Sequence, residues 1–299
     1  MAVMNQAKFA AFVQKDLSES FAYGYEDMRS NLGAVFTNES PDQAIVSQRL
    51  LGNLGSVPRF EGEVSYDDPK QSYGKETEEI EYAFGVKVTK KFRRNDLYGV
   101  VRGRVEELGE RFKMLREGIG ADVFNGAFTT TLTADGLALC HTAHTSDQVG
   151  GVSQGNKGTT AMNAVAVEST RRLMVAFKNN RGGILPGNYP TLLIVPTALA
   201  ETAYEIIQSA GKVDTALNNP NYHKGKYELL VWDNFLTSST AWFMVNQRLM
   251  RRLLKFYEWN PTEFMQAGEF DTLVSKHAGY SSCNVSALDW RFIYGHQPS

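Results

Sequence analysis

Apolar residues recur at alternating spacings of three and four through residues 96–120, and polar or charged residues fill the other faces. This pattern predicts one long amphipathic helix with Asp96 as its N-cap. At a rise of 1.5 Å per residue it would be a rod of roughly 35–40 Å. No second segment repeats the stripe, so we expect the helix to pack on a sheet or a neighbouring domain, not in a two-helix coiled coil. The apolar positions are Leu97, Val101, Val105, Leu108, Phe112, Leu115 and Ile119.

Alternation of period two predicts two strands, one from Phe60 to Tyr66 and one from Tyr82 to Val88. Turn-forming residues lie between them, so we expect a long polar hairpin over residues 52–85. Upstream, residues 1–50 contain short apolar clusters, one of them at Ile45 to Leu51. We interpret this region as an extended arm with short helices.

The second half of the chain alternates between helical and strand-like patterns. Helices are expected at about 163–177 and 196–209, and strands at 191–195, 227–232 and 240–245. Residues 253–295 contain further short strand-like stretches. The predicted fold class is therefore α+β.

The composition excludes several classes of protein. With 42% hydrophobic residues over 299 positions, the chain can bury a large core and is not mainly disordered. Its net charge of −2 argues against a protein dedicated to nucleic-acid binding. Two distant cysteines do not form a disulfide framework, so we expect synthesis in a reducing compartment. No window approaches the roughly 20 apolar residues of a membrane span.

Charge is distributed unevenly along the predicted hairpin. Between residues 61 and 81, eight acids stand against two lysines, a local charge of −6, and five bases follow over residues 87–94. Burying so many carboxylates in one domain would remove their solvation, so we expect this hairpin to project into solvent or to meet a basic surface of another subunit. The acids are Glu61, Glu63, Asp67, Asp68, Glu76, Glu78, Glu79 and Glu81, and the bases are Lys87, Lys90, Lys91, Arg93 and Arg94.

Cys140, His141 and His144 form the only cluster of soft metal ligands. A structural zinc site needs four ligands, and the other histidines and Cys283 supply no second close pair. A catalytic pair of Cys140 and His144 would need an orienting group that the sequence does not identify. The glycine-rich residues 150–158 lack the phosphate-loop pattern. We therefore expect surface loops here, with no catalytic, cofactor or metal site.

The order of segments along the chain resembles the major capsid proteins of tailed bacteriophages, and among them the Mu-like major head subunits. After the arm and the charged hairpin comes the long helix, which ends in Ile119-Gly-Ala-Asp-Val-Phe-Asn. The segment Asp135-Gly-Leu-Ala-Leu-Cys-His-Thr-Ala-His-Thr145, the α/β region and a closing segment from Gly279 to Gly295 follow. The sequence departs from that group at Cys140-His141 and at Thr145, which concerns local loop detail.

The resemblance implies the Hong Kong 97-type capsid fold. On that fold, residues 1–50 would be the N-terminal arm and residues 51–90 the E-loop hairpin, which reaches over a neighbouring subunit. Residues 91–129 would belong to the peripheral (P) domain with its spine helix. Residues 130–246 would form the axial (A) domain, and residues 247–299 would return to complete the P-domain sheet.

The function that the resemblance implies is structural, not enzymatic. Pentamers and hexamers of the chain would form an icosahedral head in the virion, assembled in the host bacterial cytoplasm. This head would enclose double-stranded DNA without sequence-specific binding and without a membrane. The expected partners are a portal, a separate scaffolding protein and a decoration protein. The alternatives are an encapsulin-like compartment shell, or a metal-binding protein or enzyme centred on Cys140, His141 and His144.

The charge pattern then suggests how copies of the chain would recognise each other. We hypothesise that the eight acids of the hairpin dock on basic residues of an adjacent subunit. An exposed ion pair contributes only about 0–1 kcal/mol, so apolar packing would supply most of the assembly energy and charge would set the register. The candidate acceptors are Arg102, Arg116, Arg251, Arg252 and Lys255.

Overall fold

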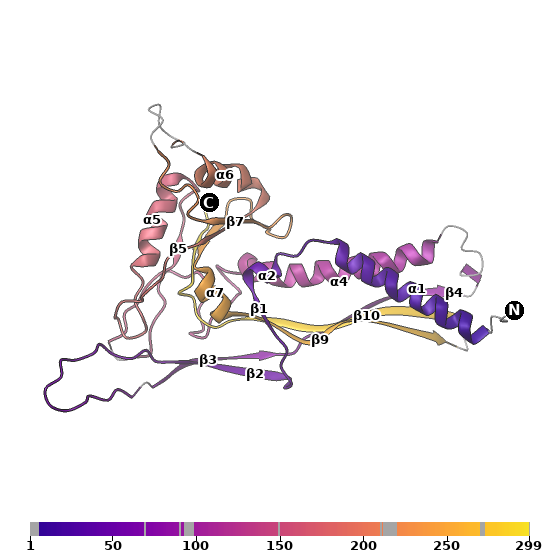
Figure 1. Ribbon diagram of the computed structural model, residues 1–299, viewed down its shortest axis with the longest axis horizontal. Helices are drawn as coiled ribbons and strands as arrows, with labels where there is room; N and C mark the ends of the chain where they lie inside the picture. Colours follow the sequence, from indigo (N-terminus) through magenta and orange to yellow (C-terminus); the bar gives the residue numbers. More distant parts are fainter. Residues whose placement is uncertain are drawn as a thin grey trace.

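The computed structural model describes residues 6–68, 70–89, 91–92, 99–148, 150–209, 211, 220–269 and 273–298, with side chains from residue 16 onward. It consists of a long flat arm, a more compact body at one end of the arm, and a hairpin that lies beneath the body (Figure 1). This arm is not the N-terminal arm predicted for residues 1–50, but a sheet with the helices that cover it. The N-terminus lies at the far tip of the arm, and the chain ends in the body. Among the described helices, none is both long enough and apolar enough to span a bilayer.

The arm is a four-stranded sheet with strand order β1-β9-β10-β4. The strands β1, β9, β10 and β4 span Thr37–Glu39, Leu254–Glu269, Val274–Ala287 and Glu81–Thr89. The short strand-like stretches expected in the tail are therefore mostly two long antiparallel strands. Helix α4 (Val100–Asn125) lies on this sheet, because Gly279 of β10 leaves room for the ring of Phe112. A Cβ atom at Gly279 would lie 2.3 Å from that ring.

The pairing of β9 with β10 is irregular near the middle of β9. Tyr280 opposes Glu263, but Ser282 opposes Asn260 and Cys283 opposes Glu258, so β9 carries two more residues than β10 over this stretch. Pro261 lies there and has no N–H to donate to the strand ladder, which accounts for the break in register. Bulges of this kind bend the strand and increase its twist.

Helix α1 (Gln6–Asp27) crosses α4 at very close range. A Cβ atom at Gly24 would lie 2.1 Å from the carbonyl oxygen of Glu106, and one at Gly109 would lie 2.2 Å from that of Phe21. Each helix therefore presents a glycine to the other helix's backbone. Leu17 and Phe21 of α1 complete the contact in a small core shared with the first half of α4.

The body is built on a second sheet with strand order β5-β11-β8-β6-β7. Strands β6 and β8 in its centre are buried at every position and have no charged residue. Helices α5, α6 and α7, a 3₁₀ turn, and the short helix α2 accompany this sheet. The strands span Lys157–Gly158, Ile293–His296, Trp242–Val245, Leu192–Val195 and Glu228–Val231, and the helices Ala164–Val175, Ala200–Gln208, Gln247–Leu253, Thr197–Leu199 and Leu32–Val35.

The last two turns of α4 reach into the core of the body. Phe124 contacts Trp232 and Phe243, with ring centroids 5.7 and 5.5 Å apart. Two turns earlier, the buried Glu117 accepts hydrogen bonds from the indole N–H of Trp232 and from the backbone of Asn31. Both groups hold α4 to the body, so a single helix joins the two cores.

Strands β2 (Ile45–Leu51) and β3 (Gln71–Glu78) pair antiparallel and form the hairpin beneath the body. Residues 52–68 connect them without helix or strand. The predicted strand at Phe60 to Tyr66 is therefore wrong, and so is its pairing with residues 82–88, because β4 pairs with β10 instead. Pro58 and Gly62 interrupt the alternation, which is typical of a loop.

The helix and strand predictions for residues 163–245 are confirmed, and α5 carries the N-cap Asn163, whose side chain accepts from the backbone of Ala166. The long helix is confirmed from Val100 onward and continues to Asn125, whereas Asp96 and Leu97 lie outside the described residues. Its packing on a sheet is also confirmed. For residues 1–50 the expectation of short helices holds only at residues 32–35: residues 6–27 form one long helix, which is a second partner of α4, and residues 45–51 form a strand.

We expect Gly24→Ala or Gly109→Ala to lower the free energy of unfolding by about 1–3 kcal/mol, because the added methyl group would meet backbone atoms that cannot move aside. Urea denaturation of the purified subunit measures this. Gly103→Ala and Gly118→Ala on the same helix α4 are matched controls, since no atom lies within 4 Å of the added group. The controls should be neutral or stabilising by about 0.5–1 kcal/mol. Equal losses for both pairs would contradict the close contact.

Candidate subunit-contact surfaces

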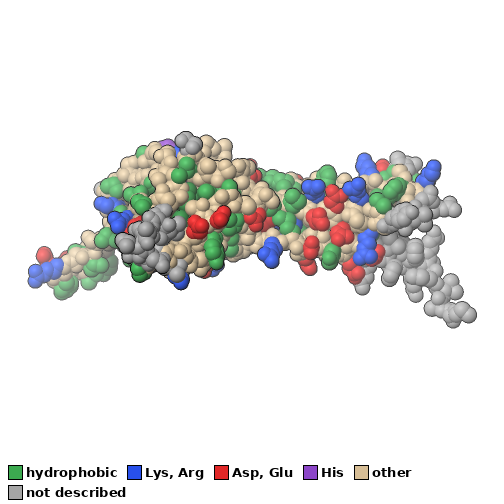
Figure 2. Space-filling view, turned by 90° about the horizontal axis from the view of Figure 1, so that it is seen from above, with side chains coloured by type: hydrophobic (Ala, Val, Ile, Leu, Met, Phe, Trp, Pro, Cys, Tyr) green, Lys and Arg blue, Asp and Glu red, His purple; other side chains and the backbone are tan. Residues whose placement is uncertain are grey.

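The loop 52–68 exposes more apolar surface than any other connection in the described chain. Its apolar side chains point into solvent along a projection that extends beyond the body, at the left in Figure 2. Monomeric soluble proteins rarely expose a contiguous apolar patch of this kind unless it is a contact surface. The exposed fractions are 67% for Leu54, 96% for Val57, 70% for Phe60, 64% for Val64 and 90% for Tyr66.

The loop is nevertheless held at its base by its own chain. One carboxylate oxygen of Asp67 accepts from the backbone N–H of Gly55 and from the guanidinium of Arg181. These two groups hold the pKa of Asp67 below its usual range, so the anchor is present at neutral pH and is lost as the pH falls through that lowered value. The backbone N–H of Asn53 donates to the side chain of Asn180, 3.0 Å away.

The hairpin stem makes a second set of polar contacts with the body. The hydroxyl of Ser72 donates to Asp147 over 2.7 Å. The ammonium group of Lys75 donates to the carbonyl oxygens of Leu132 and Ala287, at 2.7 and 3.4 Å. Burial lowers the pKa of Lys75, since these carbonyls are its only close partners among the described groups. The stem is therefore held here by directional hydrogen bonds to uncharged acceptors and not by an ion pair.

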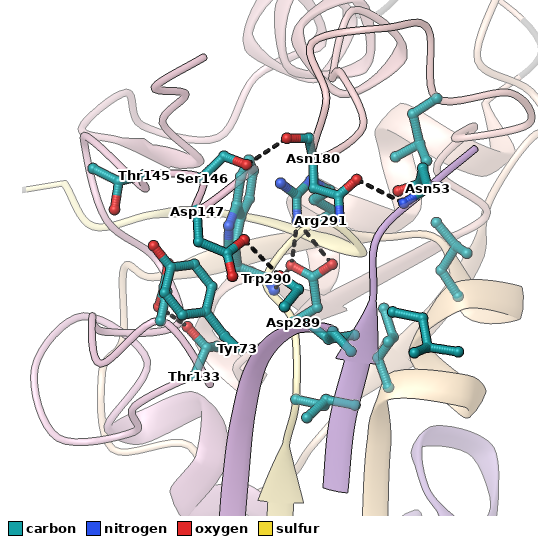
Figure 3. A pocket seen from close by; sticks show the side chains of 18 of the residues that line it. Asn53, Tyr73, Thr133, Thr145, Ser146, Asp147, Asn180, Asp289, Trp290 and Arg291 are labelled. Carbon is teal, nitrogen blue, oxygen red and sulfur yellow. Dashed lines mark hydrogen bonds and ion pairs between the residues drawn. The ribbon is translucent and has the colours of Figure 1, made fainter. Parts of the chain in front are cut away.

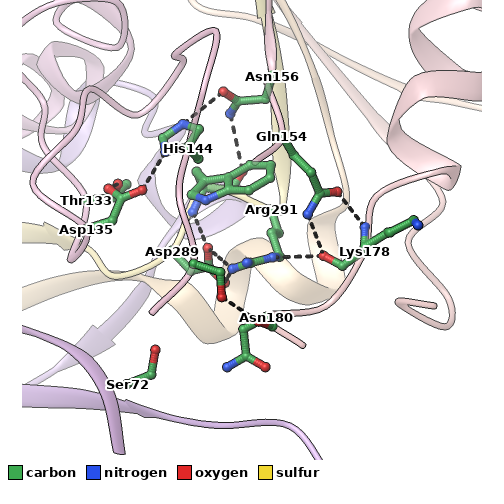
Figure 4. A network of polar contacts seen from close by, with 12 residues as sticks. Ser72, Thr133, Asp135, His144, Gln154, Asn156, Lys178, Asn180, Asp289 and Arg291 are labelled. Atoms are coloured by element: carbon green, nitrogen blue, oxygen red, sulfur yellow. Dashed lines mark hydrogen bonds and ion pairs between the residues drawn. The ribbon is translucent and has the colours of Figure 1, made fainter. Parts of the chain in front are cut away.

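A cavity of about 190 Å³ lies between the hairpin and the body (Figure 3). Asn53 and Tyr73 line it from the hairpin, and Asp147, Asn180 and Arg291 line it from the body. Arg291 is held in place by Asp289, because its Nη1 atom lies 2.9 Å from each of the two carboxylate oxygens (Figure 4). Residues from both sets of hairpin contacts line the cavity, and leucine side chains and Trp290 lie beside these polar groups, so its walls are of mixed character.

The eight acids of residues 61–81 do not form one uniform acidic surface. Glu79 accepts from Ser282 and Asn260, and Glu81 accepts from the hydroxyl of Tyr280, so these two hold β10 of their own chain. Asp67 is used by the loop anchor. The side chains of the remaining five are exposed and have no hydrogen-bond or ion-pair partner among the described residues. They are Glu61, Glu63, Asp68, Glu76 and Glu78.

The predicted basic acceptors also separate into two groups. Arg116 is buried against Phe256 and pairs with Glu258, Lys255 pairs with Glu39 over 2.7 Å, and Arg102 donates to Ser20. Burial leaves Arg116 without access to a neighbour, so it is not an acceptor for another subunit. Arg251 and Arg252 at the end of α7 are exposed and carry no ion pair in the described structure. Of the bases over residues 87–94, Lys90, Arg93 and Arg94 lie outside the described residues.

The expectation that Cys140 and His144 lie in a surface loop was wrong. Both side chains are fully buried. Burial raises the pKa of the Cys140 thiol far above its usual range, which leaves it unreactive, and its sulfur packs close to Gly295. Both ring nitrogens of His144 already face Asp135 and Asn156. The described residues contain no group of three His, Cys, Asp or Glu side chains that could hold a metal ion.

The apolar loop and its anchor could not be predicted from the local sequence pattern. Phe60 and Val64 fall in the strand predicted for residues 60–66, and Val57 falls in no predicted strand. The surrounding Gly55, Pro58 and Gly62 are nevertheless typical of a loop. The sequence does not indicate the role of Arg181, because its partner Asp67 lies more than a hundred residues away and meets it only in the folded chain.

A family model described as phage capsid protein matches residues 74–295. A search of curated proteins gave no match. Among solved structures, the capsid of cyanophage P-SCSP1u superposes with a TM-score of 0.62 at 10% identity, covering 91% of this chain and 88% of that one. The procapsid of bacteriophage JBD30 gives 0.52 at 15% identity over 99% and 76% of the two chains. A virus-like particle from Pyrococcus furiosus gives 0.51 at 10% identity over 95% and 98%.

We expect Asp67→Asn to free the loop base, because the amide oxygen is a weaker acceptor for Arg181 than a carboxylate. Limited trypsin digestion at Arg59 should become several-fold faster. Asp68→Asn is the matched control, since the side chain of Asp68 is exposed and has no partner among the described groups. Similar cleavage rates for both variants would show that the anchor does not hold the loop.

Proposed function

Because this chain belongs to the phage capsid protein family, as a structural subunit and not an enzyme, we propose that its copies join chiefly through the projecting loop 52–68. The observation that carries the proposal is the apolar surface of this loop, which its own chain leaves in water. A loop that extends beyond the body can bury this surface against a second copy without any rearrangement of the core.

Magnitudes favour apolar contact over charge as the source of assembly energy. Full burial of one Val, Leu or Phe side chain contributes about 1.5–3 kcal/mol. An exposed ion pair contributes about 0–1 kcal/mol. Val57, Phe60 and Val64 together would therefore outweigh all five free acids of the hairpin. Repetition around a closed shell multiplies either contribution by the number of contacts.

Charge then has a narrower role than the sequence alone indicated. We propose that the free acids Glu61, Glu63, Asp68, Glu76 and Glu78 set the register of the loop on a neighbour. Arg251 and Arg252 are the acceptors best placed for this, since both are exposed without ion pairs in the described structure. Arg102 and Lys255 keep a reduced role, because each already has a partner in its own chain.

We propose the larger assembly by analogy with the family. The hairpin with its loop serves as the E-loop, α4 as the spine helix of the P domain, and the body around β6 and β8 as the A domain. Pentamers and hexamers would close into an icosahedral head around double-stranded DNA, assembled in the bacterial cytoplasm. The bacteriophage JBD30 capsid is decorated with minor capsid protein trimers, and we propose an equivalent decoration protein, a portal and a separate scaffolding protein for this chain.

An encapsulin-like compartment is the less favoured alternative, because the matching family model is that of phage capsid proteins. The metal-binding or enzymatic alternative centred on Cys140, His141 and His144 is wrong: the family is structural, and the buried thiol and the occupied ring nitrogens are not available for such chemistry.

The triple variant Val57→Ser, Phe60→Ser, Val64→Ser tests the apolar contact. It should keep a folded subunit, since these side chains contact no core, and it should form no shells at concentrations where the wild type does. Negative-stain microscopy and sedimentation measure this. Ile184→Ser with Tyr204→Ser is the control, because both side chains are equally exposed elsewhere. Normal shells from the triple variant would refute the proposed role of the loop.

Replacing Glu61, Glu63, Glu76 and Glu78 by Gln tests the role of charge separately. These four lack partners in the described chain, whereas changes at Glu79 or Glu81 would also disturb β10. We expect shells to form, but with slower assembly and a weaker dependence of the assembly rate on salt. Light scattering at 50 and 500 mM NaCl, roughly three-fold apart in Debye length, measures both. An unchanged salt dependence would contradict the proposed register contact.

A further inference from the structure

The cavity between the hairpin and the body has an apolar wall that the chain itself covers only in part. Leu249, Arg252 and Leu253 line the cavity from α7, where their spacing of three and four residues puts them on one face of the helix. Leu50 and Leu51 line it from β2, and Leu51 is 69% exposed. The leucines of α7 are half-buried. These apolar groups would gain from an occupant that removes them from water.

The size of the cavity suits one aromatic ring. Its volume is about 190 Å³, and an apolar cavity of about 150 Å³ accepts benzene. Aromatic side chains that fill such pockets are often the energetic centre of a protein contact. A single side chain of another copy can therefore occupy the cavity, whereas a helix or a strand is too large for it.

Two charged groups of the cavity lining have no ion-pair partner among the described residues. Asp147 accepts hydrogen bonds from uncharged groups alone, and the guanidinium of Arg252 is exposed. The other acids and the other arginine of the lining are paired or hydrogen-bonded within the chain. An occupant that carries one base and one acid beside its ring would therefore complement the cavity in charge.

The tip of the projecting loop carries this combination in three consecutive residues, Arg59, Phe60 and Glu61. Phe60 is 70% exposed, and neither flanking charge has an ion-pair partner in the described structure. Gly55 and Asp67 anchor the base of the loop, and Phe60 lies between them, five residues beyond Gly55. An extended chain of that length carries the ring up to about 17 Å from the anchor.

The other large apolar side chains of the loop are less free to reach a neighbour. Tyr66 directly precedes the anchored Asp67, and Leu54 directly precedes the anchored Gly55. Both therefore stay beside their own body. Phe60 is the aromatic side chain that the loop can present to another copy.

We infer that Phe60 of one copy inserts into the cavity between the hairpin and the body of a neighbouring copy, with Arg59 beside Asp147 and Glu61 beside Arg252. This inference rests on the proposed function of the loop and names the surface that the loop meets. The tip and the cavity are different surfaces of the same chain, so the contact is heterologous and leads from each copy to the next.

Filling the cavity from within its own chain tests the inference. In Leu51→Trp, the larger side chain should exclude Phe60 and raise the subunit concentration that shell formation requires several-fold. Ile45→Trp is the matched control, because Ile45 lies on the same strand, is 49% exposed and does not line the cavity. Sedimentation measures assembly, and thermal unfolding of the subunits checks that both variants fold. Assembly of Leu51→Trp at the wild-type concentration would overturn the inference.

A photo-crosslinker at position 60 locates the tip directly and does not require a cavity variant to fold. Unlabelled subunits with p-azidophenylalanine in place of Phe60 are assembled as a minor fraction among nitrogen-15-labelled wild-type subunits. After irradiation, mass spectrometry should find labelled acceptor peptides that contain residues 249–253 or 288–291. An acceptor in the same chain, an acceptor elsewhere in the neighbour, or the absence of crosslinks would each contradict the insertion of Phe60.

Failure of this contact is distinguishable from failure of the proposed role of the loop. Normal shells from the triple variant Val57→Ser, Phe60→Ser, Val64→Ser would refute that role and the insertion with it. If the triple variant forms no shells while Leu51→Trp assembles normally, the loop is a contact surface whose acceptor lies outside the cavity.

Discussion

The structure depends on helix α4, whose two halves are buried in two different hydrophobic cores. The first half of α4 is buried between α1 and the arm sheet, through Val105, Leu108 and Phe112. Its second half is buried in the body, through Ala121, Val123 and Phe124. A helix of 26 residues that is held at both ends cannot shift along its axis without opening one core. The position of the arm relative to the body is therefore set by packing, and the paired glycines of α1 and α4 make that packing backbone to backbone.

The elements that the sequence predicted well are those whose pattern is local. Strands β6 and β8 are continuous apolar runs, and α5 combines an apolar stripe with the cap Asn163, so their positions could be derived from neighbouring residues alone. The predictions were wrong where contacts between residues far apart in the sequence determine the structure. Residues 6–27 form a helix because α4 accepts them through Gly24 and Gly109, and no local signal marks that contact.

The contact surface was predicted less well than the fold, and for a related reason. The acids of the hairpin were visible in the sequence, but their partners were not. Three of them turn out to hold their own chain, through Arg181, Ser282 and Tyr280. The residue types at Cys140 and His144 likewise do not indicate that both side chains are buried. A histidine beside a carboxylate and an indole is a structural group in the interior, whereas the same residues in an exposed loop would be incidental.

The extra residues of β9 near Pro261 have a geometric consequence for the particle. They lie in the arm sheet close to the level at which α4 passes from one core to the other. The arm therefore leaves the body along a bent strand, and the degree of bending is encoded by two residues. In a closed shell of identical subunits, each subunit meets its neighbours at the angle that its own arm and body allow. A change in the length of this irregularity would therefore alter the direction in which the arm reaches its neighbours.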